Sequence, residues 1–143
     1  MRHIAILLVG LVLCLSSCSL FQETLSESQP ASLKSERAEA YREAKSLMHY
    51  RFRAVQGYCK YDMVRDDTEE QQDFWEEDIE FWCKIIDRLR VAGHEDADAV
   101  ERDVLEKVKL SKARRSAKVL RNCILDSGEL YAWWYSNLTP LRE

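Results

Sequence analysis

Glycine and proline are scarce, with four glycines and two prolines among 143 residues. A β-rich domain with many tight turns needs more of both, because glycine supplies positive φ angles and proline fixes bends. In addition, no stretch alternates apolar and polar residues convincingly over the length of a strand. These deficits argue against an all-β architecture and favour helices.

Motifs that carry chemistry are also missing. The sequence has no GxSxG, no HExxH and no glycine-rich phosphate loop, and its five cysteines form neither a CxxC pair nor a zinc spacing. His94 lies close to Asp96 and Asp98, but such residues at a helix start are more typical of caps and solvated charges than of a metal site. We therefore predict that the protein is not an enzyme and that it holds no metal or cofactor.

The first eighteen residues have the organisation of a bacterial secretory signal. A basic start, Met1-Arg2-His3, precedes an apolar run from Ile4 to Leu15. As a helix this run would rise only about 18 Å, against roughly 30 Å of hydrocarbon core, so it is too short to span a bilayer. Its end, Leu15-Ser16-Ser17-Cys18, resembles the lipobox of bacterial lipoproteins. The resemblance implies cleavage before Cys18 and acylation of Cys18, with palmitate among the acyl chains.

The lipobox also implies an address and a domain plan. Residues 1–17 are expected to be a signal peptide that is removed, 18–32 a lipidated cysteine with a flexible tether, and 33–143 a helical domain. In enteric-type lipoproteins an aspartate after the cysteine retains the protein in the inner membrane, and this chain has Ser19 instead. We expect the protein on the periplasmic face of the bacterial outer membrane, anchored in that membrane by its acyl chains.

Helical periodicity predicts an all-α domain, a small bundle of four or five helices. The first helix is expected from about Leu33 to Tyr61, and Met63–Asp67 is expected to form a turn. Thr68 and Gln71 match a capping box at the start of a second helix over 69–92. The apolar stripe of the first helix consists of Tyr41, Ala44, Met48, Phe52, Val55 and Cys59, and that of the second of Trp75, Ile79, Trp82, Ile86 and Leu89.

The second half of the domain is expected to contain shorter helices. Gly93 has the position of a residue that ends a helix, and Asp96 or Asp98 can cap the third helix. A break is expected near Leu110-Ser111, with Ser111 as the next cap, because the apolar stripes before and after it are out of phase. The stripe before the break consists of Val100, Val104 and Val108, and the stripe after it of Ala113, Ala117, Leu120 and Ile124. A last helical stretch carries Leu130, Trp134 and Leu138. Gly128 is expected to act as a hinge in this stretch, and Thr139-Pro140 is expected to end it.

Charge is segregated along the chain, although the net charge of −4 gives no sign of nucleic-acid binding. Residues 66–80 contain nine acidic side chains and no basic one, and residues 107–121 contain seven basic ones and no acidic one. The two segments could be solvated faces that partly neutralise each other, or the basic segment could dock a partner or a membrane surface. Residues 131–135 add aromatic rings that one helical face cannot bury together. The candidate partner-binding residues are Lys112, Arg114, Arg115, Lys118, Trp133 and Tyr135.

Three cysteines remain for an oxidising periplasm once Cys18 is lipidated, enough for one bridge and one leftover thiol. Cys59 and Cys83 are the first candidate pair. In an ideal helical hairpin they would be offset by about 15 Å, beyond the roughly 4.4–6.8 Å between Cα atoms that a disulfide allows. The bridge therefore requires the first helix to end near Gly57; otherwise Cys123 pairs with one of the two.

The mature chain resembles QseG-type outer-membrane lipoproteins in scattered short matches. They are the lipobox, the Cys59 and Cys83 positions, Asp87-Arg88-Leu89, Arg114-Arg115, and Leu130-Tyr131 with Trp134. The resemblance implies a regulatory or adaptor lipoprotein that contacts a two-component sensor kinase in the envelope. In length and helical content the chain is also similar to the secretion pilotins, and this second resemblance implies an assembly lipoprotein whose partner is a secretin.

Overall fold

The computed structural model describes residues 30–61, 68–108 and 110–142. The chain divides into two units, Met1–Lys34 and Ser35–Glu143, and the second contains the helical domain. The predicted signal peptide, Cys18 and the turn at Met63–Asp67 lie outside the described residues.

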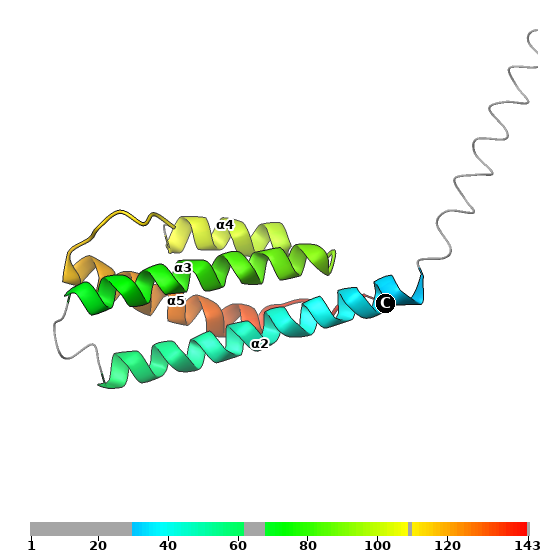
Figure 1. Ribbon diagram of the computed structural model, residues 1–143, viewed down its shortest axis with the longest axis horizontal. Helices are drawn as coiled ribbons and strands as arrows, with labels where there is room; N and C mark the ends of the chain where they lie inside the picture. The colour runs from blue at the N-terminus through cyan, green and yellow to red at the C-terminus, as the bar shows by residue number, and fades with distance from the viewer. Residues whose placement is uncertain (1–29, 62–67, 109, 143) are drawn as a thin grey trace, which may run out of the picture. The chain divides into compact units, whose positions relative to one another are not determined.

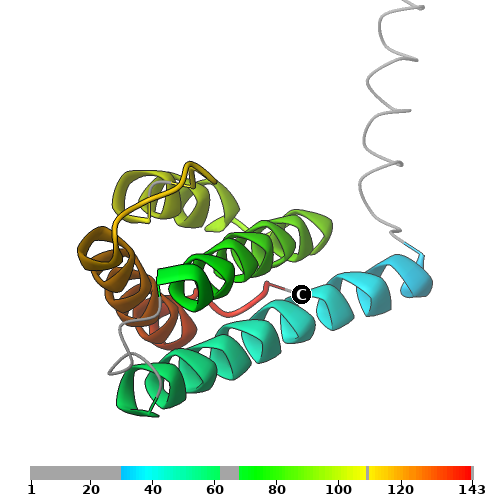
Figure 2. The same ribbon diagram turned by 60° about the vertical axis from the view of Figure 1, so that its left-hand side comes forward.

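Four α-helices and no strands make up the described part of the chain (Figure 1). They are α2 (Ala31–Tyr61), α3 (Thr68–Val91), α4 (Ala97–Lys107) and α5 (Ala117–Asn137). Within the domain, α3 packs against α4 and α5, and α4 packs against α5. Figure 2 shows α2 running along the side of this group, where buried side chains connect it to α3 and α5. The all-α prediction is confirmed.

The core lies where the periodicity of α3 and α4 predicts it. Trp75, Trp82 and Leu89 of α3 are fully buried, as are the three valines of the predicted third-helix stripe. The stripe of α2 is rotated slightly from the predicted one, because Tyr58 is buried and Cys59 only half-buried. The buried positions of α2 are Ala40, Ala44, Met48, Arg51, Val55 and Tyr58, a set that includes a charged residue.

Backbone hydrogen bonds explain how α3 ends. Gly93 has a φ of +62°, a left-handed conformation that glycine adopts without steric cost. Its N–H donates to the carbonyl of Arg90, and the N–H of His94 donates to the carbonyl of Leu89, both at 2.9 Å. This pattern is a Schellman motif, so the predicted helix-ending role of Gly93 is confirmed.

The break between the third and fourth helices is also confirmed, but the details differ. Residues 110–116 are not helical, and Ser116 rather than Ser111 precedes α5. The predicted hinge at Gly128 is wrong, since α5 continues through it. A Cβ at Gly128 would lie 2.6 Å from Cγ1 of Val55, so this glycine allows α2 and α5 to approach closely.

The predicted capping box at the start of α3 is not formed as expected. Gln71 is buried, with 1 % of its surface exposed, and neither polar atom of its amide has a hydrogen-bond partner within the described ranges. Gln71 follows the apolar stripe of α3, being four residues before Trp75. Its side chain therefore enters the core and does not reach back to the backbone of Thr68.

Candidate functional site

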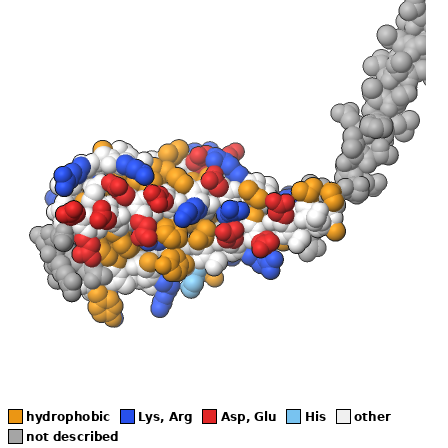
Figure 3. Space-filling model, in the orientation of Figure 1, with side chains coloured by type: hydrophobic (Ala, Val, Ile, Leu, Met, Phe, Trp, Pro, Cys, Tyr) orange, Lys and Arg blue, Asp and Glu red, His pale blue; other side chains and the backbone are white. Residues whose placement is uncertain are grey.

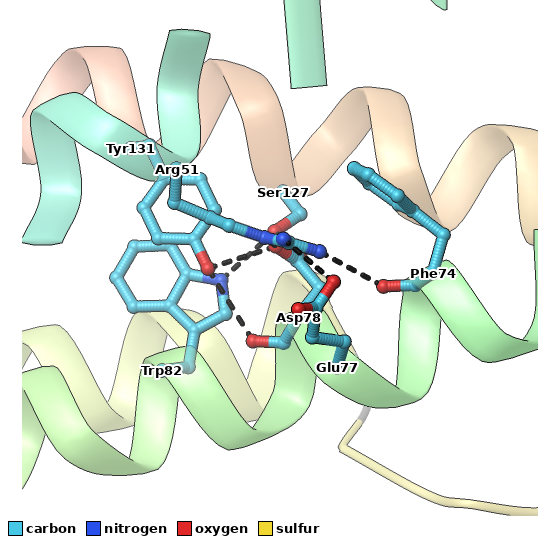
Figure 4. Close-up of polar contacts among 7 residues, drawn as sticks. All are labelled: Arg51, Phe74, Glu77, Asp78, Trp82, Ser127 and Tyr131. Carbon is cyan, nitrogen blue, oxygen red and sulfur yellow. Dashed lines mark hydrogen bonds and ion pairs between the residues drawn. The ribbon is translucent and has the colours of Figure 1, made fainter. Parts of the chain in front are cut away.

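A polar cluster in the core joins α2, α3 and α5 (Figure 4). Asp78 of α3 lies at its centre. Its Oδ1 accepts hydrogen bonds from Nε of Arg51 (2.6 Å) and from the hydroxyl of Tyr131 (2.9 Å). Its Oδ2 accepts a hydrogen bond from Ser127, whose Oγ in turn accepts one from Nε1 of Trp82 (2.8 Å). The carboxylate is thus held from both neighbouring helices.

The side chain of Arg51 is almost as fully enclosed as the carboxylate it faces, since 3 % of its surface is exposed and that of Asp78 is fully buried. The guanidinium of Arg51 lies 4.2 Å from the ring centre of Phe74 and 4.9 Å from that of Phe81. Its Nη1 pairs with Glu77 at 3.0 Å, and its Nη2 donates to the carbonyl of Phe74 at 3.0 Å. Every nitrogen of this cation therefore has a partner, which is the condition for burying a charge.

Burial sets the electrostatics of the cluster. It raises the pKa of Asp78, and the attraction of Arg51 opposes the rise. Burial lowers the pKa of Arg51, but the Asp78 carboxylate outweighs it and the net shift is upward, so the arginine stays charged. Burial, then the negative charge of Asp78, raises the pKa of Tyr131 well above its usual value. Asp78, Ser127 and Tyr131 have no exposed surface, so the cluster fixes helix positions and is closed to ligands.

The predicted basic residues lie on the connection before α5 and on its first turn, and two of them are used within the domain. Nζ of Lys112 lies 3.6 Å from a carboxylate oxygen of Glu80. The guanidinium of Arg115 lies 4.9 Å from the ring centre of Trp75. The backbone N–H of Arg115 donates to Oε1 of Gln72. These contacts attach the basic segment to the acidic helix. Figure 3 shows acidic and basic side chains interspersed on the face around α3.

The predicted aromatic residues lie near the other end of α5. Trp133 is 52 % exposed, and its ring meets that of buried Trp134 edge-on, with centroids 4.6 Å apart. Tyr135 is 38 % exposed and packs on α2, 4.9 Å from Nζ of Lys45 and 5.2 Å from the ring of His49. A hollow of about 360 Å³ adjoins Trp133, and its lining is Lys107, Asp126, Glu129, Leu130 and Trp133.

The candidate partner-binding residues therefore do not form one surface. Lys118 and Trp133 are separated by fifteen residues of one helix, or about 22 Å along its axis. Lys112 and Arg115 contact α3, whereas Trp133 adjoins a hollow that α4 and α5 share. A partner of ordinary size could contact both, but a single small pocket could not.

The Cys59–Cys83 bridge is not formed, and both residues are free thiols. The helix does not end near Gly57, as the bridge would require, but continues to Tyr61. Cys83 is exposed on α3, and its neighbour Trp82 is the residue that faces the core. Cys123 is buried in α5. Burial raises the pKa of the Cys59 thiol, which makes it less reactive.

A second polar cluster holds the chain where it leaves α5. The backbone N–H of Thr139 donates to Oδ2 of Asp96 (2.9 Å), and its carbonyl lies 2.8 Å from Nε2 of His94. The hydroxyl of Tyr41 also donates to that carbonyl, at 3.4 Å. Partial burial acts to raise the pKa of Asp96, but the hydrogen bonds from Thr139 outweigh it, so the net shift is downward. Burial raises the pKa of Tyr41, with Asp96 contributing.

The described residues contain neither a candidate membrane span nor a candidate metal cluster. No helix within these ranges is long and apolar enough to cross a membrane. Nor do His, Cys, Asp and Glu side chains gather there in groups of three that could hold a metal ion. Comparison with protein-family models, with curated proteins and with solved structures finds no match.

Neither polar cluster was predicted from the sequence. Asp78 belongs to an acidic run, but it also lies three residues after Trp75 and four before Trp82, in phase with the apolar stripe. Arg51 likewise falls between Met48 and Val55. A charged residue in phase with a buried stripe is therefore the signal that could have found the pair. No comparable signal marks Thr139, because its backbone makes the contacts.

Proposed function

We propose that the chain is a lipid-anchored protein of the bacterial envelope that acts as a non-enzymatic regulatory or adaptor protein. Acyl chains on Cys18 would hold it at the periplasmic face of the outer membrane, as the lipobox sequence implies. The helical domain would then bind a partner protein, with a two-component sensor kinase as the expected one. A secretin, the partner of a pilotin-like assembly lipoprotein, is the alternative.

One observation carries the proposal, the exposed indole of Trp133 beside a hollow. About half of the surface of Trp133 stays in contact with water, and tryptophan is enriched among residues that dominate binding energy. The edge-on contact with Trp134 restrains the ring, so less conformational entropy is lost on binding. The mixed lining of Lys107, Asp126, Glu129 and Leu130 offers polar groups around an apolar floor, as a protein interface does.

Crosslinking from a single position tests the partner. A photoreactive amino acid would replace Trp133 in cells that make the full chain, with Tyr50, a 60 % exposed aromatic residue on α2 that packs on the ring of Phe81, as the matched control position. Crosslinking of a sensor kinase from position 133 and not from position 50 would support the proposal. A secretin would favour the assembly alternative, and equal products from both positions would refute a docking role for Trp133.

The anchor is tested separately. Cys18→Ser should abolish incorporation of labelled palmitate and should move the protein out of the membrane fraction. If the variant still fractionates with the outer membrane and still takes up palmitate, the lipoprotein part of the proposal is wrong. Crosslinking from position 133 would still test whether the helical domain binds a partner.

A further inference from the structure

The segment that follows α5 is held by the backbone of one residue. Leu138 is buried in the core with 6 % of its surface exposed, and its N–H donates to the carbonyl of Trp134. Residues 139–142, which we call the strap, then leave the helix and pass beside α2, as Figures 1 and 2 both show. Both backbone polar groups of Thr139 are hydrogen-bonded to side chains of other elements.

The groove under the strap is arranged to recognise a peptide backbone. Nδ1 of His94 accepts the N–H of Asp96 at 3.1 Å, which leaves Nε2 as the ring nitrogen that donates to the carbonyl of Thr139. The carboxylate of Asp96 accepts the hydrogen bond from the backbone N–H of Thr139. The ring of Tyr41 stacks on that of His94, with centroids 5.2 Å apart and planes at 5°, and holds it in place.

Beyond Thr139 the strap fits the groove loosely. A cavity of about 190 Å³ lies between the strap and the groove, and its lining is Arg37, Gly93, His94, Glu95, Pro140, Leu141 and Arg142. The ion pair between Arg142 and Glu95, at 3.5 Å, joins side chains that are 83 % and 47 % exposed. Exposed ion pairs of this kind contribute little to stability. Apart from the half-buried side chain of Leu141, the strap therefore depends mainly on the backbone contacts of Thr139.

We propose that this groove binds an extended segment of a partner protein, and that the strap occupies it as an internal ligand. The partner segment that fits places one residue where Thr139 lies, and the backbone N–H and carbonyl of that residue are both free to bond Asp96 and His94. Glu95 favours a basic side chain three residues further on, in the place of Arg142, and the cavity gives room for an apolar side chain larger than Leu141. Backbone recognition of an extended segment is a recurrent mode of peptide binding. This inference does not require the docking role of Trp133.

A labelled peptide of residues 137–142, Asn-Leu-Thr-Pro-Leu-Arg, is the probe, and its binding to the full chain is followed by fluorescence anisotropy. Thr139→Pro in the chain removes the N–H that Asp96 accepts, and the extended backbone of Leu138 (φ −56°, ψ 128°) suits a following proline. This variant should bind the peptide at least about tenfold more tightly than wild type. Thr139→Ala keeps both backbone groups and should bind it as wild type does.

Further variants distinguish binding in the groove from binding elsewhere on the domain. Adding Asp96→Ala to Thr139→Pro should abolish the gain, whereas adding Trp133→Ala should leave it unchanged. Equal binding by the proline and alanine variants, or a gain that survives Asp96→Ala, would overturn the proposal. A wild-type dimer that Thr139→Pro dissociates would also overturn it, because the occupant would then be the strap of a second copy.

Hydrogen exchange of the wild-type chain provides a test that needs no variant. A displaceable strap opens locally, so the Thr139 amide should exchange much faster than the Leu138 amide and should be insensitive to low denaturant. If the two amides exchange at the same rate through global unfolding, the strap is a fixed part of the fold and the proposal fails.

Discussion

The buried pair of Arg51 and Asp78 gives the sharpest prediction about stability. Their side chains are 3 % and 0 % exposed, and 2.6 Å separates Nε from Oδ1. Arg51→Met should cost about 3–5 kcal/mol, because it leaves the carboxylate buried without its counter-ion. Asp78→Asn should cost less, because Arg51 keeps its pair with Glu77, whose side chain is 57 % exposed to water.

The double variant measures how strongly the two residues are coupled. In Arg51→Met/Asp78→Asn no buried charge remains at the pair, and the new amide can still accept the hydrogen bond of Tyr131. The double variant should therefore cost no more than Arg51→Met alone, so the coupling energy should be at least the cost of Asp78→Asn alone, within the roughly 0.5–3 kcal/mol typical of residues in one hydrogen-bond network. Urea unfolding followed by circular dichroism gives each free energy of unfolding.

The cost of Arg51→Met should also depend on pH. Without the cation, only the hydrogen bonds from Ser127 and Tyr131 oppose burial, so the folded-state pKa of Asp78 is raised further than in the wild type. Between the unfolded pKa of about 3.9 and the raised folded pKa, the native state binds the extra proton, so stability falls as pH rises. The variant should be closer to wild type at pH 5 than at pH 8. Additive single costs, or a cost below about 1 kcal/mol at both pH values, would refute this account of the pair.

Two other perturbations have clear signs. Gly128→Ala should destabilise the chain by about 1–3 kcal/mol, because the new methyl group meets the stiff side chain of Val55, whereas Gly57→Ala should stabilise it by about 0.4–1 kcal/mol, because its new Cβ would have no neighbour within 4 Å. Thermal unfolding that shows the same sign for both would contradict this. Because the pKa of Asp96 is lowered in the folded state, its carboxylate contributes stability above about pH 4, and this contribution is lost as the pH falls through the folded-state pKa. Asp96→Asn weakens the contact with Thr139 and should remove this contribution. Free energies of unfolding measured in urea at several pH values should therefore fall less steeply toward acid pH in the variant than in the wild type.

Periodicity predicted the helices well, because each apolar stripe follows the 3.6-residue repeat and most stripe positions are buried. Gly93 could be recognised as a terminator, since its left-handed conformation is a local property of one residue. Gly128 could not be interpreted in the same way. Its role is a close contact with Val55 on another helix, and the sequence of α5 contains no information about that distance.

The candidate site was less predictable than the fold, because exposure and pairing depend on tertiary structure. Trp133 and Trp134 are adjacent in sequence, yet one is 52 % exposed and the other 5 %. The basic segment is visible in the sequence, but the contacts of Lys112 and Arg115 with α3 are not. Mutual neutralisation of the charged segments and docking of a partner were the two alternatives. The ion pair with Glu80 favours neutralisation for Lys112, whereas the contacts of Arg115 are with the uncharged side chains of Trp75 and Gln72.

The same contacts bear on how a partner would bind. A partner that recruited Arg115 would have to replace its contact with Trp75, whereas the exposed ion pair of Lys112 with Glu80 contributes little and would be easily given up. A partner that covered Trp133 would replace water, and it would leave the contact with Trp134 intact. The net free energy of binding gained from a contact is therefore larger at the indole than at the basic segment. Salt also screens the attraction of the basic segment for an acidic partner. For the proposed partner we therefore predict that the aromatic end of α5, and not the basic segment, determines affinity, and that the basic residues affect mainly the rate of encounter.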